Sequence, residues 1–162
     1  MAREFDIVIY GATGYTGRLV AEHFLREYGD KPDAPTWAMA GRNPDKLAQV
    51  KREIGASDST PTIVADAADA TSLAQMCEQA KVIITTVGPY QLYGEPLLAA
   101  CAKSGTHYAD LCGEPAWMRQ MIDKYDADAK ASGARISFSS GFDSIPFDLG
   151  VLMLQKEAKE RF

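Results

Sequence analysis

Residues 5–20 read Phe5-Asp-Ile-Val-Ile-Tyr-Gly-Ala-Thr-Gly-Tyr-Thr-Gly-Arg-Leu-Val20, and this stretch decides the fold of the chain. Its apolar run at 7–10 is typical of a buried parallel strand, and apolar residues at helical spacing follow the glycines. Three glycines at spacing three separate the two patterns, which gives the strand, turn and helix context of a dinucleotide fingerprint. The spacing G-x-x-G-x-x-G is a variant of the commoner G-x-G-x-x-G, so each glycine needs a physical role.

Each glycine of this motif has a role that follows from its lack of a side chain. Gly11 allows the tight turn off the strand, and Gly14 lets the backbone approach a pyrophosphate with no Cβ in the way. Gly17 lets the first helix pack closely on the sheet. The free N–H groups and the positive end of that helix would then hold the phosphates. Because glycine-rich strand ends also occur as plain turns, the rest of the chain must decide between the two interpretations.

Length and composition exclude several classes of protein. The chain has 162 residues, 46% of them hydrophobic and 24% charged, which predicts one soluble globular domain. A net charge of −5 gives no support to nucleic-acid binding. No run approaches the ~20 apolar residues of a membrane span, and the first residues lack the apolar segment of a signal peptide. Three widely spaced cysteines predict neither a disulfide framework nor a metal site. We therefore expect a cytoplasmic protein.

Strand and helix patterns alternate along the whole chain, which is typical of a doubly wound α/β sheet. We expect a Rossmann NAD(P)-binding fold of three layers, α/β/α, with the strand order 3-2-1-4-5-6. One helix is expected to open at Glu95-Pro96, since proline suits the first helical position, and another at Pro115. After the strand at 7–10, further strands are expected at residues 36–40, 62–65, 81–87, 106–109 and 135–138.

This topology predicts where a ligand binds. In open α/β sheets, ligands bind at the carboxyl ends of the strands where the strand order reverses, and the first glycine loop lies at that point. A dinucleotide site beside the first and fourth strands is therefore the leading functional prediction. The segments that converge there are 11–17, 41–43, 66–67, 87–90, 110–114 and 139–144.

The end of the second strand selects the cofactor. A carboxylate there would bind a ribose 2′-hydroxyl, whereas this chain has Arg42, whose planar fork of donors suits a 2′-phosphate. NADP is therefore favoured over NAD, and the alternative is that Arg42 is a solvated surface charge. At the end of the third strand, Asp66 could accept a hydrogen bond from the adenine amino group or serve as a helix N-cap.

The fourth strand is expected to end in a stiff turn beside the nicotinamide. Gly88 permits close approach of a cofactor, and Pro89 stiffens the loop. Val87 and Tyr90 complete this turn, and Tyr93 follows. Tyr90 and Tyr93 are expected near the reacting ring, and the alternative for both is loop packing. No tyrosine is followed four residues later by lysine, so the catalytic pair of short-chain dehydrogenases is absent.

Five motifs follow one another along the chain. They are Tyr10-Gly-Ala-Thr-Gly-Tyr-Thr-Gly17, Trp37-Ala-Met-Ala-Gly-Arg42, Thr85-Thr-Val-Gly-Pro-Tyr90 with Tyr93-Gly94, Tyr108-Ala-Asp-Leu-Cys-Gly-Glu114 and Ser140-Gly-Phe-Asp-Ser-Ile-Pro146. Together they resemble the cofactor domain of the saccharopine dehydrogenase-like family, and within it the trans-acting enoyl reductase branch. The resemblance runs from about residue 5 to residue 150, and the last block is more specific than the glycine fingerprint.

The resemblance implies NADP(H)-dependent reduction. In the enoyl reductase branch, a hydride would pass to a carbon–carbon double bond of a carrier- or thioester-linked acyl chain. In the saccharopine branch, it would pass to a carbon–nitrogen bond. The resemblance also places Arg42 at the 2′-phosphate and implies a phosphate loop formed by Gly11, Thr13, Gly14, Tyr15 and Thr16.

No motif identifies a catalytic acid or base. Asp110, Glu114, Asp143 and Tyr90 are candidates by position alone. The histidines and cysteines lack the spacing of a metal site, so no metal is expected.

Residues 1–150 are expected to form the dinucleotide-binding domain, and residues 151–162 the start of a connection to a substrate domain that family members have. The chain would then bind NADPH but turn over poorly alone. Apolar residues exposed on the last helix would favour a homodimer. The alternative function is that of a non-enzymatic NADP-sensing module, because a fold alone does not establish catalysis.

Overall fold

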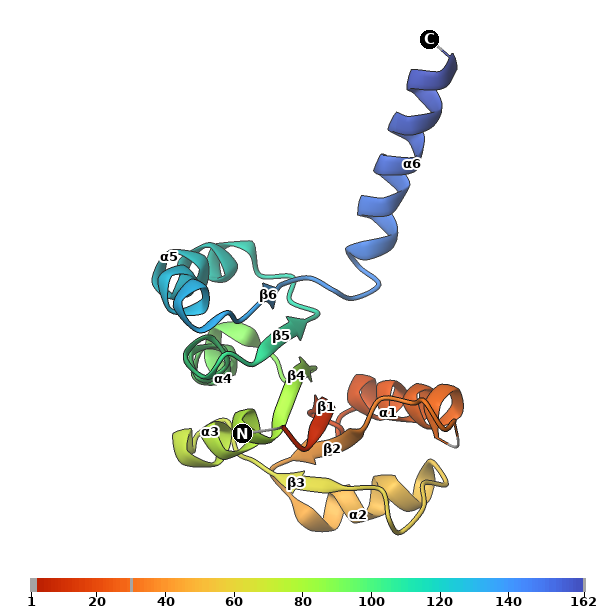
Figure 1. Ribbon diagram of the computed structural model, residues 1–162, viewed down its shortest axis with the longest axis vertical. Helices are drawn as coiled ribbons and strands as arrows, with labels where there is room; N and C mark the ends of the chain where they lie inside the picture. The colour runs from red at the N-terminus through yellow and green to blue at the C-terminus, as the bar shows by residue number, and fades with distance from the viewer. Residues whose placement is uncertain (1–2, 30, 162) are drawn as a thin grey trace.

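The computed structural model describes residues 3–29 and 31–161 of the chain. Its strands are β1 (Phe5–Tyr10), β2 (Trp37–Gly41), β3 (Thr62–Val64), β4 (Ala80–Thr85), β5 (His107–Asp110) and β6 (Ile136–Ser137). Its helices are α1 (Tyr15–Tyr28), α2 (Pro44–Glu53), α3 (Ala70–Gln79), α4 (Tyr90–Ser104), α5 (Pro115–Ser132) and α6 (Ile145–Arg161). The strands form one parallel sheet in the order β3-β2-β1-β4-β5-β6, with α1 and α2 on one face and α3, α4 and α5 on the other (Figure 1). This confirms the predicted doubly wound Rossmann fold.

The central strand β1 has a parallel neighbour on each side. Residues 7–10 pair in register with residues 37–40 of β2 and with residues 82–85 of β4. Val8 and Ile9 have no exposed surface, one facing each helical layer. Burial on both faces explains why β1 is an unbroken apolar run rather than an alternating one. The pairing also brings the carboxyl ends of β1, β2 and β4 side by side.

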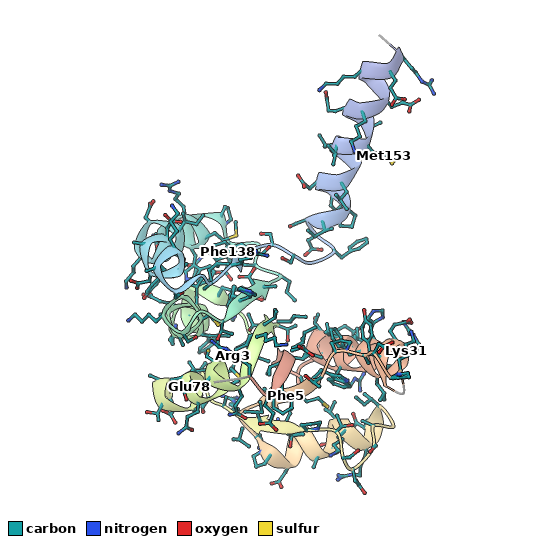
Figure 2. All side chains as sticks on the ribbon, viewed as in Figure 1. Arg3, Phe5, Lys31, Glu78, Phe138 and Met153 are labelled. Atoms are coloured by element: carbon teal, nitrogen blue, oxygen red, sulfur yellow. The ribbon has the colours of Figure 1, made fainter. Side chains whose placement is uncertain are left out.

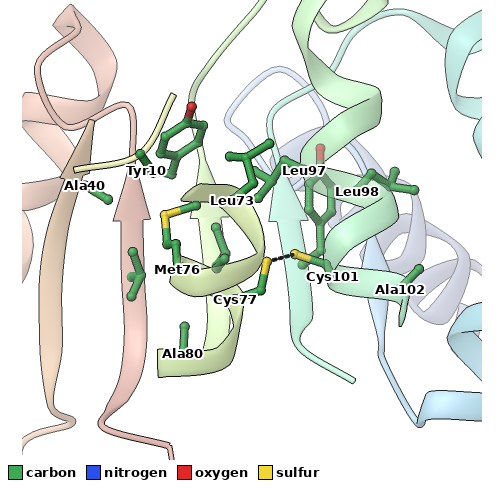
Figure 3. Packing of buried hydrophobic residues seen from close by; sticks show 14 of the residues in the cluster. Tyr10, Ala40, Leu73, Met76, Cys77, Ala80, Leu97, Leu98, Cys101 and Ala102 are labelled. Atoms are coloured by element: carbon green, nitrogen blue, oxygen red, sulfur yellow. Dashed lines mark hydrogen bonds between the residues drawn. The ribbon is translucent and has the colours of Figure 1, made fainter. Parts of the chain in front are cut away.

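The apolar core lies in two layers, one on each face of the sheet. In the larger layer, Leu73 and Met76 of α3 gather with Leu97 of α4 (Figure 3). Cys77 and Cys101 meet in the same layer, with their sulfur atoms 3.6 Å apart. Both thiols are fully buried, and burial raises the pKa of Cys101 well above its usual value. The smaller layer consists of Ile9, Ala12, Ala21, Phe24, Met39, Leu47 and Val50.

The start of α4 differs from the sequence prediction. The helix begins at Tyr90 rather than at Glu95-Pro96, so Pro96 lies inside it. The two carboxylate oxygens of Glu114 accept hydrogen bonds from the N–H groups of Tyr90 and Gln91, at 2.7 and 2.9 Å. These bonds satisfy the first turn of the helix and allow it to start before the proline. Because Glu114 is distant in sequence, no local pattern indicates this start.

The last helix, α6, leaves the body of the domain. None of its residues is buried, and it extends away from the sheet and the other helices (Figures 1 and 2). Met153, labelled in Figure 2, is 72% exposed. The apolar residues that the sequence predicts to be exposed on this helix are therefore exposed in the structure, and they are distributed around the helix rather than on one face. They are Ile145, Phe147, Leu149, Val151, Leu152, Met153 and Leu154.

Among the described residues, no helix is both long enough and apolar enough to cross a lipid bilayer.

Helices α4 and α5 meet at a glycine. A Cβ atom on Gly94 would lie 2.7 Å from a ring carbon of Trp117, closer than any side chain can approach. The Trp117 ring is 4% exposed and is held by Tyr90 and Phe138, at centroid distances of 5.6 and 5.8 Å. The aromatic cluster therefore requires glycine at position 94.

We expect Gly94→Ala to lower the free energy of unfolding by about 1–3 kcal/mol, because the added methyl group would clash with the buried Trp117 ring. Urea denaturation measures the change. Gly150→Ala is the matched control, since Gly150 is also helical and no atom of the described residues lies within 4 Å of its Cβ position. That control should be at least as stable as the original chain, because alanine forms helices more readily than glycine. Equal stability of Gly94→Ala would contradict the close packing.

A carboxylate with a lowered pKa lies near the amino-terminal end of the central strand β1. The Asp6 carboxylate accepts hydrogen bonds from Lys81 Nζ at 2.6 Å and from the Thr36 N–H at 2.8 Å. These bonds lower the pKa of Asp6 to about 2. Because the folded state favours the ionised carboxylate, the interaction contributes its full stability at pH values above the pKa that the Asp6 carboxyl has in the unfolded chain.

This contribution should be lost as the pH falls through the folded pKa of about 2. We therefore expect the original chain to lose more stability than Asp6→Asn between about pH 4 and pH 2. Urea unfolding of both proteins across that range is the measurement. Parallel stability curves for the two proteins would show that Asp6 does not contribute in this way.

Candidate cofactor site

A cleft of about 390 Å³ opens at the carboxyl ends of β1, β2 and β4. It lies where the strand order reverses, as expected for a ligand site in an open α/β sheet. Predicted cofactor residues that line it are Gly11, Thr13, Gly14, Arg42, Asp66, Val87 and Gly88. Gly41 and Ala67, which belong to the segments expected to converge here, also line it, as does Tyr93, expected either near the reacting ring or as loop packing. Lining residues that the sequence prediction did not name as cofactor residues are Tyr10, Ala68 and Thr86.

The glycine loop lines the middle of this cleft, since it follows β1, which lies between β2 and β4. Gly11 has φ +90°, a left-handed conformation that favours glycine, and its Cβ would lie 2.7 Å from Thr86 Oγ1. A Cβ on Gly17 would lie 2.1 Å from the carbonyl oxygen of Gly11, so α1 packs against the turn only because position 17 is glycine. Gly14 differs, because among the described residues a Cβ there would meet only the Gly11 oxygen, at 3.3 Å. The space beside Gly14 is therefore open to the cleft.

The N-terminus of α1 has no side-chain cap among the described residues. Its N-cap is Gly14, and its first turn contains no acidic residue. The neighbouring helices are different: Asn43 caps α2, Asp69 caps α3, and Glu114 binds the first N–H groups of α4. The N–H groups of the first turn of α1 therefore stay available to an anion beside the cleft, where the helix dipole also favours negative charge.

Arg42 and Asp66 lie on the cleft wall formed by the ends of β2 and β3. Both are close enough to affect the pKa of Tyr10. Burial raises this pKa to about 12, the negative charge of Asp66 also raises it, and the positive charge of Arg42 lowers it. One alternative for Asp66 is wrong, because the N-cap of α3 is Asp69. The Asp66 carboxylate instead accepts a hydrogen bond from the Ala68 N–H at 3.0 Å and shapes the turn before α3.

The loop after β4 forms the opposite wall. The predicted strand at 81–87 ends at Thr85, so Val87 and Gly88 lie in the loop and line the cleft. The Tyr90 ring, expected near the reacting ring of the cofactor, points into the core and is 4% exposed. Its hydroxyl donates to the Thr85 carbonyl oxygen at 3.1 Å. Tyr93, in the same first turns of α4, lines the cleft instead.

The remaining predicted residues do not line the cleft with their side chains. Tyr15 is 78% exposed and lines an adjoining hollow with Arg18 and Lys46. Thr16 is exposed and Gly17 is buried, so their contribution at the start of α1 is through the backbone. Pro89 is the N-cap residue of α4, directly after the lining residues of the loop.

Two of the candidate acids, Asp110 and Glu114, use their carboxylate oxygens in hydrogen bonds within the fold. Asp110 is 3% exposed and accepts hydrogen bonds from the Tyr108 hydroxyl and from the N–H groups of Cys112 and Ser139, at 2.8, 3.0 and 2.8 Å. Burial raises the pKa of this carboxyl. Glu114 is turned toward α4, as described above. Within residues 3–29 and 31–161, no group of three or more His, Cys, Asp or Glu side chains could hold a metal ion.

Comparison with known proteins finds relatives that match nearly the whole of this chain. A trans-acting enoyl reductase of Mycobacterium ulcerans is 49% identical over 160 residues, which are 98% of this chain and 37% of the relative. A trans-acting enoyl reductase of Mycobacterium tuberculosis is 47% identical over 159 residues, with the same coverage. The chain thus spans about 37% of the length of these relatives.

Solved structures show the same fold at low sequence identity. Saccharopine dehydrogenase (L-Glu forming) from Saccharomyces cerevisiae superposes with a TM-score of 0.59 at 14% identity, over 86% of this chain and 28% of that chain. Triphenylmethane reductase of Citrobacter sp., complexed with NADP(H), gives a TM-score of 0.58 at 17% identity, over 82% and 48%. Residues 7–136 match the family described as saccharopine dehydrogenase NADP binding domain. The chain therefore belongs to the saccharopine dehydrogenase NADP-binding domain family.

Proposed function

We propose that the cleft holds NADPH and that this domain serves the reduction of a small-molecule or carrier-linked acyl substrate. The observation that supports it is that an uncapped helix N-terminus and Arg42 border the same cleft. The first can hold a pyrophosphate, and the second a 2′-phosphate. The acyl substrate follows from the relatives named trans-acting enoyl reductase.

The residues on the cleft suggest how the cofactor would be held. The pyrophosphate would lie against Gly14 and the first N–H groups of α1, with the 2′-phosphate at Arg42. The adenine would lie beside Asp66, and the nicotinamide riboside beside Gly88 and Tyr93. When bound, NADPH supplies the hydride. The chain's own residues bind and orient it, and the carboxylates of Asp110 and Glu114 stay engaged in hydrogen bonds within the fold.

We also propose that α6 is covered in a longer protein. The relatives extend well beyond the matched region, since the chain spans about 37% of their length. The exposed apolar residues of α6 suit a surface on which a substrate-binding part of such a protein packs. In the isolated chain, the same surface favours self-association into a homodimer. Catalytic turnover of the isolated chain would be weak, because the substrate-binding part is absent from it.

Replacing Arg42 tests the cofactor assignment. We expect Arg42→Ala to weaken NADPH binding about 10–100-fold, because a charge-assisted contact to phosphate contributes about 1.5–3 kcal/mol. NADH binding should stay unchanged, so the preference for NADPH would disappear. Isothermal titration of both nucleotides is the measurement, and Arg119→Ala on the exposed face of α5 is the control. Equal affinity of the original chain for NADPH and NADH would reject the role of Arg42.

A second test separates binding from stability at two glycines of the same loop. Gly17→Ala should lower the free energy of unfolding by about 2 kcal/mol or more, because its Cβ would overlap the Gly11 carbonyl group. Gly14→Ala should keep the melting temperature within a few degrees but weaken NADPH binding at least about tenfold, since a methyl group would occupy the pyrophosphate position. Unchanged NADPH affinity in Gly14→Ala would place the pyrophosphate elsewhere.

A further inference from the structure

The loop between β4 and α4 is held at both ends. At its start, the Thr86 N–H donates to the Tyr10 carbonyl oxygen at 3.0 Å, which ties the loop to β1. At its end, Glu114 accepts hydrogen bonds from the N–H groups of Tyr90 and Gln91, at 2.7 and 2.9 Å. Between these two attachments lies the part of the loop that lines the cleft, including Val87 and Gly88.

The attachment at the end of the loop depends on a distant carboxylate. Pro89, the N-cap residue of α4, has no side chain that accepts a hydrogen bond. Glu114 supplies the missing acceptors. One of its carboxylate oxygens accepts from the N–H of Tyr90 and the other from the N–H of Gln91, so both oxygens are used. A negative charge at the positive end of a helix is further stabilised by the helix dipole.

Glu114 is itself tied to the sheet. Its N–H donates to the Cys112 sulfur at 3.3 Å, and the Cys112 N–H donates to the Asp110 carboxylate at 3.0 Å. Asp110 is the last residue of β5 and pairs with Thr85 at the end of β4. The carboxylate that holds α4 is therefore fixed relative to the same strand end from which the loop leaves.

We propose that Glu114 is the positioning residue of the nicotinamide half of the site. It acts through the N-terminus of α4, and it sets the place of the Val87–Pro89 loop against which the nicotinamide riboside lies. This inference rests on the proposed function. It assigns Glu114 a role other than that of an acid or base, since both oxygens are occupied by backbone N–H groups.

The test compares how a substitution at Glu114 changes the affinity for the whole cofactor and the affinity for its adenosine half. The variant is Glu114→Gln, which keeps the size of the side chain but leaves only one acceptor for the two N–H groups. The ligands are NADPH and adenosine 2′,5′-bisphosphate, which carries the adenosine and the 2′-phosphate but lacks the nicotinamide riboside. Because a disordered loop must be reordered on binding, we expect NADPH affinity to fall at least about tenfold, with affinity for the bisphosphate within about twofold.

Glu95→Gln is the matched control. Glu95 is also a glutamate that joins α4 to α5, through the Tyr125 hydroxyl at 2.8 Å, but it does not line the cleft. It should leave the affinities for both ligands unchanged. A merely structural role for Glu114 would reduce binding of both ligands equally, and that result, or unchanged binding of both, overturns the proposal. If the original chain binds neither ligand, the proposed function itself has failed.

Amide hydrogen exchange of the original chain gives a test that needs no variant. NADPH should slow exchange at residues 87–91 as well as at the start of α1 and near Arg42, whereas adenosine 2′,5′-bisphosphate should slow it at the start of α1 and near Arg42 but not at residues 87–91. If Glu114→Gln does not fold, this comparison still tests whether the nicotinamide riboside lies against the Val87–Pro89 loop, on which the proposal depends. Equal protection of residues 87–91 by the two ligands would overturn the proposal.

Discussion

The contact between Gly17 and the Gly11 carbonyl group is the constraint on which the site depends. A Cβ on Gly17 would lie 2.1 Å from that oxygen, so α1 reaches the end of β1 only with glycine at this position. The left-handed turn at Gly11 then brings the first turn of α1 to the carboxyl edge of the sheet. Because β1 pairs with both β2 and β4, the same turn lies between the two walls of the cleft.

The helix N-termini at this edge are used in two ways. Those of α2, α3 and α4 are bound by Asn43, Asp69 and Glu114, so these three are part of the structure's own hydrogen bonding. Those of α1 and α5 have no side-chain cap among the described residues, and of these two only α1, with Gly14 as its N-cap, borders the cleft. This difference, rather than the presence of glycines alone, supports a phosphate site at α1. It also explains why Glu114, a carboxylate near the cleft, is an unsuitable acid or base.

The sequence predicts most of what local patterns control. Strand order, the glycine turn and the position of Arg42 all follow from periodicity and from the rules of doubly wound sheets. Two of the errors concern features that a residue distant in sequence determines. The start of α4 depends on Glu114, and the inward turn of the Tyr90 ring depends on its contact with Trp117 of α5. No short window of sequence contains both members of either pair.

The central claim is that the pyrophosphate of NADPH lies at the N-terminus of α1. A titration of ¹⁵N-labelled chain with NADPH, followed by two-dimensional NMR, tests it most directly. The account predicts the largest amide shifts at residues 12–17, with smaller shifts at residues 41–43 and 86–91. Shifts concentrated at the start of α5 or along α6, with residues 12–17 unmoved, would contradict it.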